Sequence, residues 1–235
     1  MNPEDHFINI YSHHADQYHE MIAVEDVDGN LLPALENVAS LQGKRVLDLG
    51  SGTGRIPLLI HEIAAEVVVL DLHWDMLCEQ SRQRQALGGT WGLLQGDMRF
   101  LPFASNSFDI ITVGWAIGHF TGWYSEDWQA QVGLVLEEMR RVAAPGGALI
   151  ILETLTTGSL IPKPPSPGLA TYYAWLENEW GFTRQEISTD YLFPSLDEAA
   201  HYAEFFFGEE LATKVRTNNW VRLPEWTGVW SKVLA

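Results

Sequence analysis

Cysteine and basic residues are scarce in this chain. Its 235 residues include one cysteine, Cys78, which excludes an intramolecular disulfide and a zinc centre built from several thiolates. The 14 Lys and Arg stand against 31 Asp and Glu, a formal net charge of −17, and the nearest approach to a basic cluster is Arg82 with Arg84. Such a surface repels phosphate backbones, so we expect no nucleic-acid partner. The charge by itself favours nothing more specific than solubility.

Long apolar runs are also missing. No stretch approaches the ~20 consecutive apolar residues that a membrane-spanning helix needs, so we expect no membrane partner. The N-terminal segment MNPEDHFINIYSHH is polar and acidic, which is not typical of a secretory signal. These features predict a cytoplasmic protein, and no pattern in the sequence indicates its oligomeric state.

The composition is that of a globular protein, with 46% hydrophobic and 19% charged residues. From residue 45 onward, short apolar strands alternate with helical segments. The predicted strands are 46–49, 67–70, 90–95, 108–113 and 148–152, and the predicted helices between them are 53–64, 75–87 and 126–142. Strands that alternate with helices form a parallel, doubly wound α/β sheet with right-handed crossovers.

The remaining segments are less regular. The sequence APGG at 144–147 predicts a turn, and the prolines of 162–168 exclude regular structure because they lack backbone N–H donors. Helices are predicted over 170–179, 196–207 and 209–215, and strands near 186–193 and at 228–235. Residues 1–40 have the aromatic and apolar spacing of short amphipathic helices, with a further helix beginning near Pro33. We therefore divide the chain into a helical N-terminal segment, 1–40, and an α/β domain, 41–235.

Three glycines at alternate positions follow the first predicted strand, in VLDLGSGTGR. A strand, a glycine-rich turn and a helix in succession indicate a nucleotide-containing cofactor. The dinucleotide motif G-x-G-x-x-G needs its third glycine where this chain has Arg55. The spacing of Gly50, Gly52 and Gly54 therefore disfavours a nicotinamide cofactor.

Acidic residues lie at or near the ends of the first three predicted strands, at Asp48, Asp71 and Asp97. The carboxyl ends of parallel strands meet at one edge of a sheet, so we expect these three residues to form one site. Each also fits a structural role, respectively a turn cap, a helix N-cap and an ordinary loop acid.

Four segments follow one another at regular intervals: VLDLGSGTGR, VVVLDLHWDML, LLQGDMRFLPFASNSFDIITVGWAIGHF and EEMRRVAAPGGALIILE. In this order they resemble the class I S-adenosylmethionine-dependent methyltransferases, in particular the methyltransferase type 11-like group with quinone- and small-molecule-modifying members. The resemblance spans Leu41 to Glu153. It implies a Rossmann-like, mostly parallel seven-stranded sheet with helices on both faces and an antiparallel last strand.

The resemblance also implies a cofactor, S-adenosylmethionine, with S-adenosylhomocysteine as its product. Gly50, Gly52 and Gly54 would let backbone amides approach the amino-acid part of the cofactor, since no Cβ intervenes. Asp48 would orient this loop or reach the cofactor ammonium through water. Asp71 would accept both ribose hydroxyls, because one carboxylate can take two donors.

Other residues are assigned by the same resemblance. They are Leu72 and Met76 around the adenine, Asp97 and Met98 at its edge, Gly114 and Trp115 beside the methionine part, and Tyr11 and Tyr18 of the N-terminal segment as a cover over it. Arg55 would either pair with the cofactor carboxylate or lie on the helix surface. His13, His14 and His19 are poorly spaced for one helical face, so we expect a surface or lid role for them and no metal site.

The acceptor is less clearly indicated. Amino-directed DNA methyltransferases usually have an Asn/Asp-Pro-Pro-aromatic stretch where this chain has GWAIGHF, which disfavours a DNA base as the acceptor. His119 in this loop is the candidate catalytic base, because imidazole titrates near neutral pH, and its alternative role is to position the loop. Nearby aromatic residues predict either an apolar acceptor site or core packing: Trp115, Phe120, Trp123, Tyr124, Trp128, Tyr172, Tyr173 and Trp175.

The leading hypothesis is methyl transfer from S-adenosylmethionine to a small-molecule acceptor by in-line displacement, with an O, N or C nucleophile. One alternative is a non-catalytic S-adenosylmethionine-binding regulatory module, because fold does not fix function. Another is a protein methyltransferase, since an acidic surface suits a basic protein. A nicotinamide oxidoreductase is a third alternative, which the glycine spacing disfavours.

Overall fold

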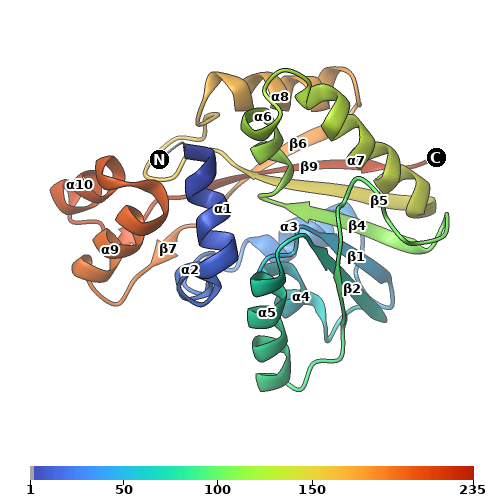
Figure 1. The fold of residues 1–235 in the computed structure, drawn as a ribbon, viewed down its shortest axis with the longest axis horizontal. Coiled ribbons are helices and arrows are strands. Elements are labelled where there is room, and N and C mark those ends of the chain that lie inside the picture. The colour runs from blue at the N-terminus through green and yellow to red at the C-terminus, as the bar shows by residue number, and fades with distance from the viewer. Residues whose placement is uncertain (1–2) are drawn as a thin grey trace.

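A seven-stranded sheet runs through the computed structural model, which describes residues 3–235 (Figure 1). Its strands are β1 (Arg45–Leu49), β2 (Glu66–Asp71), β3 (Gly92–Gln95), β4 (Phe108–Gly114), β5 (Ala143–Thr154), β6 (Thr183–Ser188) and β9 (Trp226–Val233). They lie in the order β3-β2-β1-β4-β5-β9-β6, and β9, the last strand in the chain, runs antiparallel to both its neighbours. This topology confirms the predicted Rossmann-like, mostly parallel sheet.

Helices cover both faces of the sheet. They are α1 (Pro3–His13), α2 (Ala15–Ile22), α3 (Leu31–Val38), α4 (Arg55–Ile60), α5 (Trp74–Ala86), α6 (Phe120–Trp123), α7 (Trp128–Val142), α8 (Pro167–Asn178), α9 (Leu196–Phe207) and α10 (Glu209–Asn218). Within residues 3–235, none of these helices is both long enough and apolar enough to cross a membrane.

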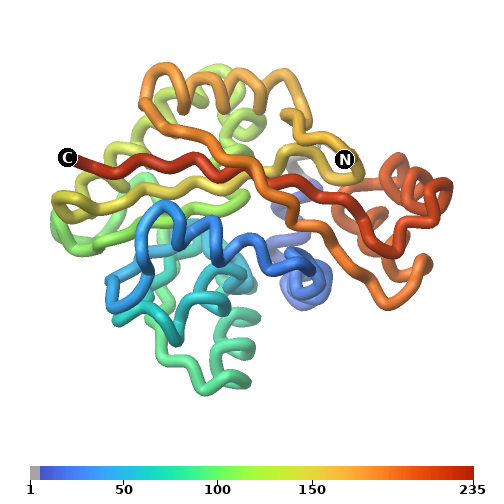
Figure 2. The backbone as a smooth tube through the Cα atoms, turned by 180° about the vertical axis from the view of Figure 1, so that it is seen from behind, coloured from blue at the N-terminus to red at the C-terminus, as the bar shows by residue number. Residues whose placement is uncertain are grey.

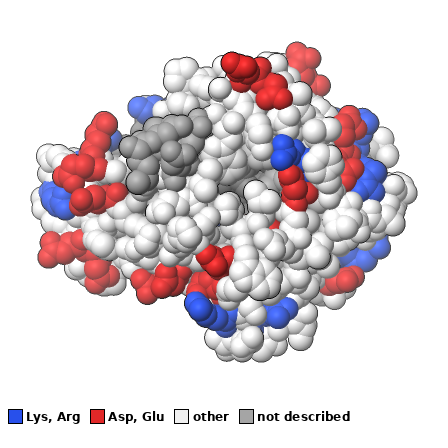
Figure 3. Space-filling view, in the orientation of Figure 1, with Lys and Arg blue, Asp and Glu red and all other residues white. Residues whose placement is uncertain are grey.

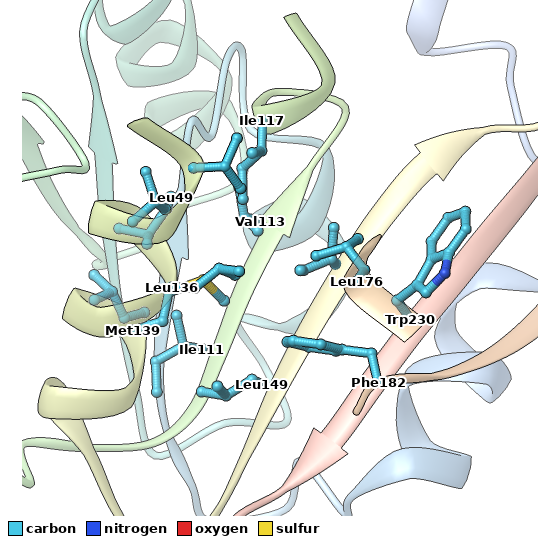
Figure 4. Packing of buried hydrophobic residues seen from close by; sticks show 14 of the residues in the cluster. Leu49, Ile111, Val113, Ile117, Leu136, Met139, Leu149, Leu176, Phe182 and Trp230 are labelled. Carbon is cyan, nitrogen blue, oxygen red and sulfur yellow. The ribbon is translucent and has the colours of Figure 1, made fainter. Parts of the chain in front are cut away.

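Alternate side chains of each strand face opposite sides, which produces two hydrophobic cores. Leu47 and Leu49 pack with residues of α7 and α8 on one face, in the core that Figure 4 shows. Val46, which neighbours Leu47 in the strand, packs with residues of α3 and α4 on the other face. The sheet is therefore buried on both sides, as its nearly continuous apolar strands predict.

The turn predicted at 144–147 is wrong. β5 already begins at Ala143, which pairs with Phe108 before the register shifts. Gly146 has φ +75°, and a Cβ on Gly147 would lie 2.8 Å from the carbonyl oxygen of Ala144. The glycines therefore permit a bulged start to the strand, and pairing with β4 overrides the local preference for a turn.

Three other boundaries also differ from the prediction. The helix predicted over 53–64 is reduced to α4: Gly54, with φ +103°, precedes its first residue, and the helix ends at Ile60. The strand predicted near 186–193 is divided into β6 and β7 (Tyr191–Leu192). α8 begins inside the proline-rich segment predicted as irregular, because the Ser166 side chain accepts a hydrogen bond from the Leu169 amide and caps the helix.

A third group of buried residues lies beside the sheet. Met21 and Ile22 of α2 pack with Tyr191 of β7, with buried residues of α9 and α10, and with Leu223 of β8 (Arg222–Leu223). Figures 1 and 2 both show these segments together at one end of the molecule. We call α1, α2, β7, β8, α9 and α10 the cap, and it is built from both ends of the chain.

We expect the core against α7 to dominate stability. Leu136 is fully buried on this helix, whereas Leu134 is 43% exposed. Leu136→Ala should lower the free energy of unfolding by about 2–5 kcal/mol, because it removes buried apolar surface and leaves a cavity. Urea denaturation followed by circular dichroism measures this loss. The control Leu134→Ala should change stability by only about 0.5 kcal/mol, and equal losses would contradict this packing.

Candidate functional site

The carboxyl ends of β1, β2 and β4 border a cavity, and side chains of α1 and α2 border it from the cap. Its lining includes the site residues predicted from the sequence, with one exception: Tyr11, Tyr18, Asp48, Gly50, Gly52, Arg55, Asp71, Leu72, Met76, Asp97, Met98, Gly114, Trp115 and His119. The exception is Gly54. The parallel sheet thus brings residues that are distant in sequence to one edge. We call this the first cavity.

The three glycines of the loop have different environments. Gly50 has φ +60°, and a Cβ there would lie 2.6 Å from the Cβ of Ala116, so the loop passes tightly behind the end of β4. Gly52 has φ +55°, and its nearest neighbour would be Tyr18 at 3.9 Å, so its backbone is open to the cavity. Gly54 faces the Gln80 side chain of α5 instead, 2.9 Å from where its Cβ would be. Its role is therefore helix packing.

Asp71 joins the end of β2 to the glycine loop. Its carboxylate accepts hydrogen bonds from the backbone amides of Gly52 and His73, each at 2.8 Å. Burial raises the pKa of this carboxyl, and the two amide donors oppose that effect. The residue preceding α5 is His73, so the alternative that Asp71 is the N-cap of this helix is wrong.

The two other predicted acids have contrasting environments. Asp48 is buried and accepts from the Thr112 hydroxyl at 2.6 Å, and burial raises its pKa to about 7. Both carboxylate oxygens of Asp97 accept hydrogen bonds from the guanidinium of Arg99, which lowers the pKa of Asp97. Both line the first cavity, Asp48 as a buried group and Asp97 as half of a partly exposed ion pair. Beside them, Met76 is 1% exposed and Leu72 is 55% exposed.

Arg55 is a buried ion-pair partner. Its guanidinium pairs with the carboxylate of Glu25, and its side chain is only 14% exposed. The guanidinium carbon also lies 3.7 Å from the ring centroid of Trp115, a cation–π contact. The alternative that Arg55 lies on the helix surface is therefore wrong.

Side chains of the cap meet the loop after β4 at the first cavity. The Tyr11 hydroxyl and the Nε2 of His119 are 3.0 Å apart, and the Tyr11 and Tyr18 rings pack edge to face. His119 stacks on Trp123, and burial together with the nearby His73 lowers its pKa to about 4. At neutral pH the His119 imidazole is therefore uncharged. The histidines predicted to have a surface or lid role include His19, whose Nδ1 lies 3.0 Å from the Thr53 hydroxyl.

The aromatic residues after β4 and in α8 divide between the two predicted roles. Trp115, Trp123 and Tyr124 line the first cavity, as does Phe120, although its side chain is buried. Tyr172 and Tyr173 are buried in the core, and Trp128 and Trp175 pack against each other at its margin. The loop after β4 therefore contributes to the site, and α8 contributes mainly to the core.

A second cavity of about 830 Å³ adjoins the first. The two cavities share Tyr11, Tyr18, Ile22, Arg55, Trp115, His119 and Trp123. Three buried acids that line it, Glu25, Glu153 and Glu225, were not singled out from the sequence. Glu153 had a detectable signal, because it lies near the end of a strand at the same edge as Asp71. Glu25 and Glu225 had no such signal in the sequence, because only the fold brings them together.

Glu153 holds the loop after β4. It is 4% exposed, and its Oε1 accepts a hydrogen bond from the Gly118 amide at 2.8 Å. Burial raises its pKa to about 8, so the folded protein holds a proton that the unfolded chain releases at a lower pH. Glu153 thus makes folding pH-dependent.

The surface carries charge of mainly one sign. In the view of Figure 3, acidic side chains are spread around the molecule, and basic ones occur singly or in small groups. Among the described residues, no continuous basic surface is visible on this face.

Comparisons with known proteins point to one family. Residues 47–151 match the family model described as a methyltransferase domain. A demethylmenaquinone methyltransferase of Thermus thermophilus is 35% identical over 132 residues, which are 55% of this chain and 53% of that protein. A malonyl-[acyl-carrier protein] O-methyltransferase of Legionella pneumophila is 31% identical over 144 residues, 60% and 46% of the two chains. The chain thus spans about half the length of the curated relatives it matches.

A solved structure extends the comparison to the fold. A SAM-dependent methyltransferase from Aquifex aeolicus has a TM-score of 0.54 to this chain and covers 89% of it, with 91% of its own length. Its sequence identity is 15%, so this likeness concerns the fold alone.

The raised pKa of Glu153 predicts a pH-dependent effect on stability. The pKa of Glu153 in the folded protein lies above its ordinary value. The stability that this group contributes is therefore fully present below the ordinary pKa and is lost as the pH rises through about 8. Glu153→Gln imitates the protonated carboxyl, so it should become increasingly more stable than wild type as the pH rises from about 5 to about 9. Urea denaturation across this range measures the difference.

The matched control for this experiment is Glu137→Gln, at a side chain that is 52% exposed on α7. Its stability difference from wild type should show no comparable rise with pH. A pH-independent difference for Glu153→Gln would contradict the burial of its charge.

Proposed function

We propose that this protein, whose residues 47–151 match a methyltransferase domain, transfers the methyl group of S-adenosylmethionine to a small-molecule acceptor. One observation carries the proposal: the first cavity places Asp71 and Asp97, from the ends of neighbouring strands, around an open glycine backbone. Such a set of groups suits a ligand with a sugar diol, an amino-bearing base and a charged amino-acid end.

The chemistry of the donors and acceptors fits this cofactor. The backbone at Gly52 has open space beside it, which permits close approach of a ligand. Each oxygen of Asp71 accepts one backbone N–H, so lone pairs remain for the two ribose hydroxyls. We assign Leu72 and Met76 to the adenine faces. Asp97 and the Met98 amide take the adenine edge, where Arg99 fixes the orientation of the carboxylate.

Methyl transfer requires alignment more than activation by the protein. When bound, the cofactor supplies an already activated methyl group for in-line displacement. Alignment of the reacting groups can lower a barrier by up to ~7–11 kcal/mol. We assign this task to Gly114, Trp115 and the cap residues Tyr11 and Tyr18, which lie at or near the junction of the two cavities and restrict access of water.

We propose that His119 is a positioning residue. With a pKa of about 4, its imidazole accepts a proton only weakly, which makes it a poor general base near neutral pH. It remains a good hydrogen-bond partner, and its contact with the Tyr11 hydroxyl holds α1 against the loop after β4.

The N-terminal segment has two parts in this proposal. α1 and α2 belong to the cap and act as a lid over the first cavity. α3 packs through Leu31 and Leu35 into the sheet core, so it belongs with the domain. We therefore refine the domain boundary expected at residue 40 to the segment between α2 and α3.

We propose a small-molecule acceptor bound in the second cavity. Its volume of about 830 Å³ falls within the range of small-molecule sites, roughly 300–1,000 Å³. A cytoplasmic location without a nucleic-acid partner suits the acidic surface. The alternatives, a non-catalytic binding module and a protein methyltransferase, share the first cavity and differ in the step after cofactor binding.

Cofactor binding tests the proposal directly. S-adenosylhomocysteine and S-adenosylmethionine should both bind in isothermal titration calorimetry, and failure of both would refute it. Asp71→Ala should weaken binding by ~1.5–3 kcal/mol, about 10- to 150-fold, because charged hydrogen bonds are lost. The control is Asp75→Ala, an exposed acid in the first turn of α5, which should leave the affinity unchanged. An unchanged affinity in Asp71→Ala would remove Asp71 from the site.

A labelling experiment separates the functional alternatives. The purified protein is incubated with methyl-labelled S-adenosylmethionine and a cell extract, and the label is followed into small molecules and proteins. We expect a labelled small molecule. Label in a protein fraction would favour protein methylation, and binding without turnover would favour a regulatory module.

A further inference from the structure

The second cavity has walls of two kinds. Aromatic side chains form much of its surface, among them Phe7, Tyr11, Tyr18, Trp115, Tyr191 and Phe206. The end of β5, the segment after α2 and the segment just before β9 contribute acids instead. The cavity extends from the loop after β4 to α10 of the cap, and Figure 1 shows α1 and α2 between that helix and the sheet.

Three of the acids that line this cavity are almost completely buried. Glu153 and Glu225 are 4% and 2% exposed, and the side chain of Glu25 is 2% exposed. Glu225 accepts a hydrogen bond from the Thr154 hydroxyl through Oε1, at 2.6 Å. Its Oε2, like the Oε2 of Glu25, is enclosed without a hydrogen bond of good geometry among the residues described, although Thr157 stabilises the Glu225 carboxylate and Tyr191 stabilises that of Glu25. A buried acceptor without a donor costs free energy, so these two oxygens favour a ligand that brings donors.

Positive charge is deficient inside the cavity. Arg55 is the cation in its interior, and it already pairs with Glu25. The other basic residues of the lining, Lys163 and Lys214, are exposed. Among the described residues, three buried carboxyls therefore face one guanidinium. Burial raises the pKa of Glu153 and of Glu225 to about 8, so both carboxyls hold a proton near neutral pH. A cation in the cavity would favour the ionised forms of these carboxyls and would be stabilised by them.

We propose that the acceptor is a small organic ammonium ion, a protonated primary or secondary amine, held in the second cavity by Glu25 and Glu225. The N–H groups of the ammonium donate to the Oε2 atoms of these two residues. Before transfer, one N–H proton would pass to the Glu225 carboxylate, and the lone pair left on the nitrogen would form the N–CH3 bond as the S–CH3 bond breaks and S-adenosylhomocysteine leaves. The aromatic rings enclose its carbon skeleton and add cation–π attraction. The proposal rests on the methyltransferase function proposed above and specifies the acceptor class for it.

The test compares amines with neutral molecules of the same shape. Phenethylamine and tryptamine are titrated into the protein saturated with S-adenosylhomocysteine, beside 2-phenylethanol and tryptophol. We expect each amine to bind at least about tenfold more tightly than its alcohol, because hydrogen bonds to buried carboxylates are the stronger ones. Equal affinity of amine and alcohol, or no amine binding at millimolar concentration, would overturn the proposal.

Substitutions test which carboxyl groups produce the preference for amine over alcohol. Glu225→Gln keeps the shape of the side chain and removes its ability to ionise beside a bound ammonium, so the preference for amine over alcohol should fall to near unity. Glu25→Gln should reduce it as well. The matched control, Glu137→Gln on the exposed side of α7, should keep the full preference. A preference that persists in Glu225→Gln would contradict the assigned site.

Binding of S-adenosylhomocysteine to each variant serves as the reference measurement. It should be unchanged in Glu225→Gln, which shows that the variant is folded and that the first cavity is intact. If wild type bound S-adenosylhomocysteine but no amine, the acceptor class would be wrong and the methyltransferase proposal would stand. If wild type bound no S-adenosylhomocysteine, the proposed function itself would fail.

Discussion

The hydrogen bond from the Gly52 amide to the Asp71 carboxylate is the contact on which the first cavity depends. It joins the loop after β1 to the end of β2, and a second bond, from the Gly50 amide to the Leu70 carbonyl, reinforces the junction. On its other side the loop lies against Ala116, so closely that Gly50 leaves no room for a Cβ. The ends of β2 and β4 therefore hold the glycine loop in place. A rigid loop of this kind can present its backbone to a ligand at little cost in entropy.

Buried carboxyl groups recur around both cavities, and each one opposes folding when it is ionised. The protein compensates with local donors: the Thr112 hydroxyl for Asp48, backbone amides for Asp71, and the Gly118 amide for Glu153. Compensation is incomplete beneath the cap, where Glu25 and Glu225 each retain an oxygen without a well-formed hydrogen bond to any of residues 3–235. Natural proteins commonly accept such losses of stability at functional sites. The uneven compensation is thus an argument that the second cavity is built for binding.

Short-range patterns predicted the part of the site that lies close in sequence. The strand, glycine turn and acid that follow one another in β1 and β2 identify Gly52 and Asp71, because a parallel sheet places the carboxyl ends of neighbouring strands at the same edge. The same reasoning failed for Gly54, which packs on Gln80, since sequence spacing does not reveal what a glycine faces. It failed again at residues 144–147, where pairing between β4 and β5 overrode a local turn preference. The pairing of Arg55 with Glu25 depends on how α2 packs, which no local pattern encodes.

The residues that the sequence predicted contribute mainly to the first cavity, and those that it did not predict contribute mainly to the second. Residues 47–151, which match the methyltransferase family, contribute the glycine loop and the strand-end acids of the first cavity. Glu25, Tyr191 and Glu225, which give the second cavity its character, lie outside that range. Similarity to the relatives therefore bears on the cofactor far more than on the acceptor. Because the cap draws on both ends of the chain, changes there can alter the acceptor while β1, β2 and β4 keep the first cavity unchanged.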